Sequence, residues 1–132
     1  MERDLVISSQ LINIDKVRRF LDEIFSESCL NRNYFNRVFL GISEAVNNSI
    51  VHGNCLDKDK QVFIRVVFKD DQLHIEIKDE GVGFTIEGLA DPTASDNLKK
   101  ESGRGIFIIQ NIADEVEYCD GGSKVLIKYT FD

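Results

Sequence analysis

Apolar residues repeat with a helical period near the start of the chain. Between residues 14 and 28 they fall at positions i, i+3, i+4 and i+7, with charged residues between them; the apolar set is Val17, Phe20, Leu21 and Ile24. This spacing puts the apolar side chains on one face, so we expect an amphipathic helix that packs against a sheet. Residues 4–9, just before it, are expected to form a short strand.

A second helix is predicted from about Asn33 to His52. At roughly 100° of rotation per residue, its apolar residues share one narrow sector that should face the core. They are Phe35, Phe39, Ile42, Val46 and Ile50. Gly53 follows directly and is expected to end the helix in a left-handed turn.

The second half of the chain is predicted to be rich in strands. Strands are expected over 62–69 and 73–78, with Asp70 and Asp71 as the turn of a hairpin. A polar stretch without periodicity, about 84–102, contains the single proline and is long enough to act as a lid.

A third helix is expected to start near Gly105, with Ile106 and Ala113 on its apolar face, followed by strands over 116–119 and 124–131. The order βααββαββ predicts an α+β fold. We expect a two-layer α/β sandwich, in which one helical layer covers one face of a mixed, mostly antiparallel sheet.

Composition fits one soluble domain over residues 1–132. The chain is 42% apolar and 30% charged with a formal charge of -7, which favours a single compact core. The three cysteines form no CxxC pair, so reduced thiols are expected rather than disulfides or a zinc site. With no apolar signal segment or membrane span, we expect a cytoplasmic protein without a membrane partner. The acidic balance argues against nucleic-acid binding, which depends on clustered Lys and Arg.

A column of polar residues follows the second helix on the side opposite its apolar sector. Glu44, Asn48 and His52 are four residues apart and therefore lie above one another. Such a face is most often simply solvated. Asn is mildly unfavourable within a helix, however, and its amide oxygen is a hard ligand that suits Mg²⁺. Asn48 is therefore a candidate magnesium ligand, and Glu44, one turn earlier, a candidate general base.

Two glycines follow the strand expected over 73–78, in the sequence Asp79-Glu-Gly81-Val-Gly83. Glycine allows a backbone to approach a ligand closely. The Asp79 carboxylate would accept a hydrogen bond from the amino group of adenine, which guanine lacks at that position. By itself this motif is equally well interpreted as a plain β-turn.

A second pair of glycines, Gly103 and Gly105, opens the predicted third helix. The unpaired N–H groups and the dipole of a helix start favour an anion such as phosphate. Lys99, Lys100 and Arg104 add positive charge there, although an ordinary solvated loop is the alternative. Neither glycine pair extends to GxxxxGK[ST] or GxGxxG, so the P-loop and dinucleotide folds are excluded.

Taken in order, three segments resemble the N, G1 and G2 boxes of the Bergerat-fold (GHKL) ATPases. They are EAVNNSIVHG from Glu44, DEGVG from Asp79 and SGRGIF from Ser102. Within that superfamily the motif sequences are most similar to those of the anti-sigma-factor serine/threonine kinases, and the resemblance spans nearly the whole chain. The resemblance implies a histidine-kinase-like ATPase domain that binds ATP and Mg²⁺ under a lid. It also implies phosphorylation of a STAS-domain anti-anti-sigma protein, in many members sequestration of a sigma factor, and commonly a homodimer.

Carried over by residue, the resemblance makes Glu44 the general base, Asn48 the magnesium ligand and Asp79 the adenine reader. The further nucleotide-binding residues that it implies are Gly81, Gly83, Lys100, Ser102, Gly103, Arg104, Gly105 and Ile106. For His52 it suggests a structural or phosphate-side role, while a histidine that complements the helix dipole is the alternative. Ser123 stands where the family often has Thr before the last strand, and its hydroxyl leaves an adenine contact open.

These observations favour an ATP-dependent serine/threonine kinase that works as an anti-sigma partner switch. The alternative is a binding module that uses ATP as a conformational ligand and sequesters a sigma factor or another regulator without significant turnover. A detached histidine-kinase catalytic domain ranks last, because the only histidines are His52, inside the nucleotide motif, and His74.

Overall fold

The computed structural model describes residues 1–81, 113–120 and 123–131. Within them the chain forms a five-stranded sheet with the order β1-β2-β3-β5-β4. Each neighbouring pair is antiparallel. The strands are β1 (Glu2–Ser8), β2 (Gln61–Lys69), β3 (Gln72–Lys78), β4 (Glu115–Cys119) and β5 (Lys124–Thr130).

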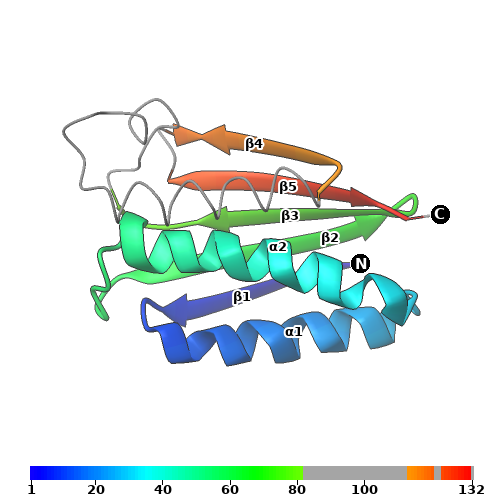
Figure 1. Ribbon diagram of the computed structural model, residues 1–132, viewed down its shortest axis with the longest axis horizontal. Coiled ribbons are helices and arrows are strands. Elements are labelled where there is room, and N and C mark those ends of the chain that lie inside the picture. The colour runs from blue at the N-terminus through cyan, green and yellow to red at the C-terminus, as the bar shows by residue number, and fades with distance from the viewer. Residues whose placement is uncertain (82–112, 121–122, 132) are drawn as a thin grey trace.

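Two helices, α1 (Ile14–Glu27) and α2 (Phe35–Asn48), cover one face of this sheet (Figure 1). Short 3-10 turns, η1 (Leu11–Asn13) and η2 (Arg32–Tyr34), precede them, and a π-helical turn, η3 (Ser49–Gly53), prolongs α2. The predicted α+β architecture, with one helical layer on one sheet face, is therefore confirmed.

Period-two alternation builds the layer between the sheet and the helices. In β3, Leu73, Ile75 and Ile77 are at most 1% exposed, whereas His74 and Lys78 are exposed on the other side. Burying an aliphatic side chain of this size contributes roughly 1.5–3 kcal/mol relative to leaving it exposed. The α1 residues predicted for the core are all buried against this layer; they are Val17, Phe20, Leu21 and Ile24.

The buried face of α2 is wider than its periodicity predicted. Ile42 is buried as expected, but Phe35 is only partly buried, and Val38 and Ala45 join the core. The reason is that α2 packs against α1 as well as against the sheet, so its contact arc covers two directions.

The hairpin turn is confirmed and the helix end is corrected. Asp70 and Asp71 have φ of 55° and 59°, the left-handed pair that joins two strands tightly. At the end of the second helix, the left-handed residues are Cys55 and Leu56, with φ of 54° and 59°, and not Gly53. The helical backbone continues through Gly53, so this glycine serves another purpose.

The lid expected at 84–102 lies outside the described residues. So does the third helix expected from Gly105, apart from Ala113, which is partly buried.

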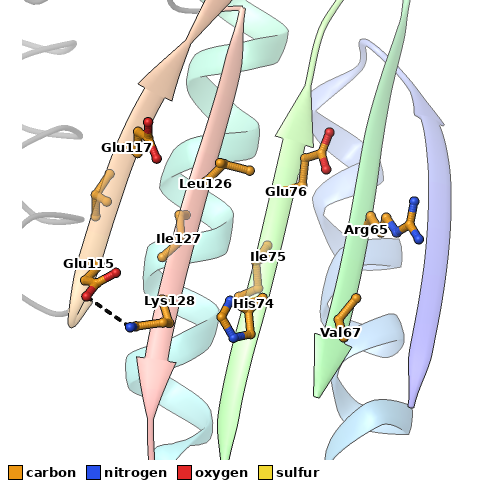
Figure 2. A pocket seen from close by; sticks show the side chains of 11 residues that line it. Arg65, Val67, His74, Ile75, Glu76, Glu115, Glu117, Leu126, Ile127 and Lys128 are labelled. Atoms are coloured by element: carbon orange, nitrogen blue, oxygen red, sulfur yellow. Dashed lines mark ion pairs between the residues drawn. The ribbon is translucent and has the colours of Figure 1, made fainter. Parts of the chain in front are cut away.

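The sheet face opposite the two helices carries a shallow groove across β2, β3, β5 and β4 (Figure 2). Charged side chains line much of it, and Lys128 Nζ lies 3.0 Å from Glu115 Oε1. Asp79 follows Ile77 on the helix-facing side, since alternate strand residues share a face. The groove therefore lies on the sheet face opposite to Asp79.

Candidate functional site

The C-terminal part of α2 carries the two residues predicted for catalysis and metal binding. Glu44 is partly buried, and Asn48, the last residue of α2, is 5% exposed. A merely solvated helix face would leave an Asn side chain accessible, so the burial of Asn48 argues against that interpretation. Glu44 and Asn48 remain one turn apart, as predicted.

The π-helical turn η3 follows at once. Here the Asn54 N–H donates to the Ser49 carbonyl at 2.8 Å, an i→i+5 bond in place of i→i+4. Rotation per residue changes after Asn48, so the regular column expected in an α-helix is not continued unchanged to His52. His52 is partly buried within this turn. Such π-helical turns occur frequently at functional sites.

Asp79 lies directly after β3 and is 3% exposed. Its N–H donates to the Ser123 carbonyl at 2.8 Å, and its Oδ1 accepts from the Gly81 N–H at 2.9 Å. Its second oxygen, Oδ2, is buried and has no hydrogen-bond partner in the described part of the chain. A buried acceptor of this kind is costly unless a ligand completes it.

Burial raises the pKa of the Asp79 carboxyl above its ordinary value of 3.8. Three weaker influences lower the pKa: the hydrogen bond from the Gly81 N–H, the Ser49 hydroxyl and the charge of Lys60. The Ser49 hydroxyl lies near the carboxylate but makes no hydrogen bond to Oδ2. The effect of desolvation on the pKa is larger than the effect of these three together, so the ionised carboxylate is poorly solvated in this site.

Two glycines bring the end of η3 against the turn that follows β3. A Cβ on Gly53 would lie 2.2 Å from Asp79 Oδ2, and one on Gly81 would lie 1.8 Å from the Gly53 carbonyl oxygen. Both distances are far below van der Waals contact. Gly53 is therefore required for this close approach, which sequence reasoning missed because it assigned the glycine to a helix end.

Asn54 is a second residue that sequence reasoning missed. It is fully buried, and its Oδ1 accepts from the Glu80 N–H at 2.8 Å. Its Nδ2 donates to Ser9 Oγ at 2.7 Å and to the Gln61 carbonyl at 3.0 Å. The only available signal was its place directly after the N-box segment, because an Asn beyond a helix end is usually interpreted as a turn residue.

The structure brings Ser123, a predicted adenine-side residue, next to Asp79, and Ser123 is 9% exposed. Its carbonyl holds the Asp79 N–H, while its hydroxyl donates to the Asp120 carbonyl at 3.0 Å. The remaining predicted site residues lie outside the described part of the chain; they are Gly83, Lys100, Ser102, Gly103, Arg104, Gly105 and Ile106.

The described residues fit a nucleotide laid along the end of α2. Among these residues no donor reaches Oδ2 of Asp79, so this acceptor could take a hydrogen bond from the amino group of a base. From Gly53 back to Glu44 the helix runs about 14 Å, at roughly 1.5 Å per residue. A base at Asp79 would thus place the phosphates along Asn48 and Glu44.

A helix-covered antiparallel sheet with a carboxylate at a strand end, glycine contacts and a polar helix end is compatible with a nucleotide-binding domain. The family model described as "Histidine kinase-like ATPase domain" matches residues 7–129. The chain belongs to this GHKL family, in the branch that contains the anti-sigma-factor kinases.

Relatives of this chain include bacterial regulators. It is 45% identical over 95 residues to the anti-sigma F factor of a Geobacillus strain, covering 67% of this chain and 64% of the relative. It is 41% identical over 86 residues to the anti-sigma F factor of Oceanobacillus iheyensis, covering 63% and 58%. It is 28% identical over 98 residues to the serine-protein kinase RsbW of Listeria monocytogenes, covering 68% and 62%. The chain thus spans about six tenths of the length of these relatives.

Among solved structures, the fold is similar to the crystal structure of the RsbU and RsbW domains of Rv1364c from Mycobacterium tuberculosis. The TM-score is 0.68 at 14% identity, covering 98% of this chain and 31% of that one. At this identity the likeness supports the fold alone. In the parts of the chain that the structure describes, neither helix combines the length and apolar character needed to cross a membrane.

Proposed function

We propose that this chain binds ATP with Mg²⁺ and transfers the γ-phosphoryl group to a STAS-domain anti-anti-sigma protein. It would act as a serine/threonine kinase and an anti-sigma regulatory factor in one partner switch. The observation that carries the proposal is the buried Oδ2 of Asp79, which lies beside the Gly53–Gly81 contact and has no hydrogen-bond partner among residues 1–81, 113–120 and 123–131. The carboxylate oxygen is complementary to the amino group of adenine. Membership of the ATPase family supports a triphosphate as the rest of the ligand.

The proposed mechanism begins with Glu44 as general base. Its carboxylate takes the proton of the acceptor serine or threonine hydroxyl, whose oxygen attacks the γ-phosphorus. The bond to the β–γ bridging oxygen breaks, and ADP leaves with the electron pair. Asn48 would hold Mg²⁺ through its amide oxygen, and the cation would neutralise phosphate charge. The predicted phosphate-binding residues Lys100, Gly103, Arg104 and Gly105 would complete the site.

The proposed partners follow from the relatives and the family. The names of relatives suggest a sigma factor as the sequestered target and a serine as the phosphoryl acceptor. The resemblance to the anti-sigma-factor kinases suggests that this serine lies on a STAS-domain protein. We further propose that the protein is cytoplasmic and forms a homodimer. Analytical ultracentrifugation of the purified chain would test the homodimer.

The Glu44→Gln variant tests the kinase assignment. Gln keeps the size of the side chain and one oxygen acceptor but cannot take the proton, so phosphoryl transfer from labelled ATP should fall by about 10²–10⁴-fold. The dissociation constant for ATP with Mg²⁺, measured by calorimetry, should stay within about twofold.

Ser43→Ala is the matched control for that experiment. Ser43 neighbours Glu44, but its hydroxyl donates only locally, to the Leu40 carbonyl at 3.0 Å. This variant should transfer phosphate at the normal rate. Undiminished transfer by Glu44→Gln would refute the assignment of the general base.

The names of several similar relatives favour a second candidate function. Several are called anti-sigma F factor without mention of kinase activity. In this alternative, ATP sets the conformation of a binding module and the biological act is sequestration. Incubation with labelled ATP, a STAS protein and a sigma factor separates the two, because a pure binder forms complexes but yields no phosphoprotein.

A further inference from the structure

Asn54 uses its whole side-chain amide to join three parts of the chain. The fully buried group accepts from the Glu80 N–H at 2.8 Å, after β3. It donates to Ser9 Oγ at 2.7 Å, after β1, and to the Gln61 carbonyl at 3.0 Å, at the start of β2. An amide offers two donors and one acceptor group, so each is engaged. Its backbone also continues the π-helical turn, through the Ser49 carbonyl.

These contacts lead directly to the Asp79 carboxylate. The Glu80 peptide held by Asn54 lies between Asp79 and Gly81, and the Gly81 N–H donates to Asp79 Oδ1 at 2.9 Å. On the other side, the Ser123 carbonyl holds the Asp79 N–H at 2.8 Å. The turn over residues 79–81 is thus fixed by Ser123, which directly precedes β5, and by Asn54 at the helix end.

Glu80 adds a second tie on the same side as Asn54. Its Oε2 accepts from the Gln61 N–H at 2.6 Å, while the Gln61 carbonyl receives Asn54 Nδ2. Asn54 and Glu80 therefore clamp the start of β2 to the end of β3.

We infer that Asn54 is a positioning residue for base recognition: its amide fixes the 79–81 turn, so that Asp79 Oδ2 is aimed at the amino group of a six-aminopurine. The inference rests on the proposed function and adds a residue that the three sequence boxes do not contain. Asn54 touches no ligand itself and acts through Glu80 and Gly81.

Asn13 provides a matched comparison. It is also a buried Asn, 6% exposed, and its Nδ2 donates to the Ser8 carbonyl at 3.0 Å and to Ser8 Oγ at 2.8 Å. Both bonds stay within the connection between β1 and α1. Asn13→Ala therefore removes buried amide hydrogen bonds of the same kind without releasing the turn at Asp79.

The test compares two nucleotides with the Asn54→Ala and Asn13→Ala variants. Dissociation constants are measured by calorimetry for ATP and for purine riboside triphosphate, which lacks the amino group. The wild-type chain should prefer ATP by about tenfold or more, since one hydrogen bond to a charged group contributes roughly 1.5–3 kcal/mol. Asn54→Ala should reduce this preference to near one, and Asn13→Ala should keep it.

A second readout needs no nucleotide. Asp79 is titrated by carbon-detected NMR in the free protein. Releasing the turn admits water to the carboxylate, so Asn54→Ala should move the Asp79 pKa back toward an ordinary Asp, and Asn13→Ala should not. If Asn54→Ala does not fold, Asn54→Ser, which keeps a small polar group, is measured in the same two ways.

The outcomes separate the inference from the proposed function. A folded Asn54 variant with the wild-type preference for ATP overturns the inference, and so does an equal loss in Asn13→Ala. A wild-type chain that binds neither nucleotide overturns the proposed function and the inference with it.

Discussion

At Asp79, stability and recognition act against each other. Burial raises the pKa of this carboxyl above 3.8, so the folded protein binds the proton more tightly than the unfolded chain does. The resulting contribution to stability is present at low pH and is lost as pH rises through the folded-state pKa. At neutral pH the ionised carboxylate is therefore a net cost to the fold, which the proposed contact with adenine would offset.

Asp79→Asn should separate the two effects. The neutral amide removes the buried charge, so the free energy of unfolding in urea at pH 7 should rise by about 1 kcal/mol. The affinity for ATP should fall at least tenfold, because the amide nitrogen cannot accept a hydrogen bond from the adenine amino group.

The pH profile of ATP affinity serves as the control for this variant. In the wild type, affinity should weaken as pH falls toward the raised pKa of Asp79, and so at a higher pH than for an ordinary Asp. Calorimetry between pH 7.5 and 4.5 should show a flatter profile for Asp79→Asn. Wild-type ATP affinity in that variant would rule out Asp79 as the base reader.

At the scale of elements, the site depends on how closely η3 approaches the end of β3. Both contact residues are glycines, and a methyl group on Gly81 would meet backbone first, 1.8 Å from the Gly53 carbonyl oxygen. The backbone at Gly53 cannot move away from such a methyl group as easily as a side chain can. The nearest atom to the Gly53 position is instead the tip of the Asp79 side chain.

Gly53→Ala should therefore spare the fold and damage the site. The new methyl, 2.2 Å from Asp79 Oδ2, should turn the carboxylate aside. We expect ATP affinity to fall at least tenfold, while circular dichroism shows the native secondary structure. Cys55→Ala is the control, because Cys55 is exposed and two residues further on, and it should bind ATP normally. Normal affinity in Gly53→Ala would show that the contact is not part of the site.

At the scale of the whole molecule, the proposed nucleotide joins elements that are separate in the sequence. Glu44 and Asn48 belong to α2, whereas Asp79 follows β3 and is held by the turn before β5. A ligand that contacts all of them binds only the folded chain. Its binding free energy then adds to global stability.

Saturating ATP with Mg²⁺ should accordingly raise the thermal midpoint. At about 100 times its dissociation constant the nucleotide should add about 2.7 kcal/mol, which a scanning calorimeter detects as a shift of several degrees. Glu44→Gln should show the same shift, and Asp79→Asn a smaller one. An unchanged wild-type midpoint would contradict nucleotide binding at this site.

Much of the architecture was predictable because it depends on patterns of residues that are close together in the sequence. The alternation of Leu73, Ile75 and Ile77 predicts both the strand and its buried face. Asp70 and Asp71 predict the hairpin because short polar residues tolerate left-handed backbone. The burial of Asn48 was not predictable, because it depends on what packs over α2 rather than on helical period.

The sequence by itself determined the period of each element, the carboxylate that we propose as the adenine reader and the spacing of Glu44 and Asn48 one turn apart. These are properties of neighbouring residues, which short-range geometry fixes. Only the tertiary structure decided that Gly53 meets Gly81, that Asn54 holds Glu80 and that no donor among the described residues reaches Asp79 Oδ2. The partners in these contacts are separated by more than twenty residues, and burial and close approach arise only when the helix end and the strand end pack together.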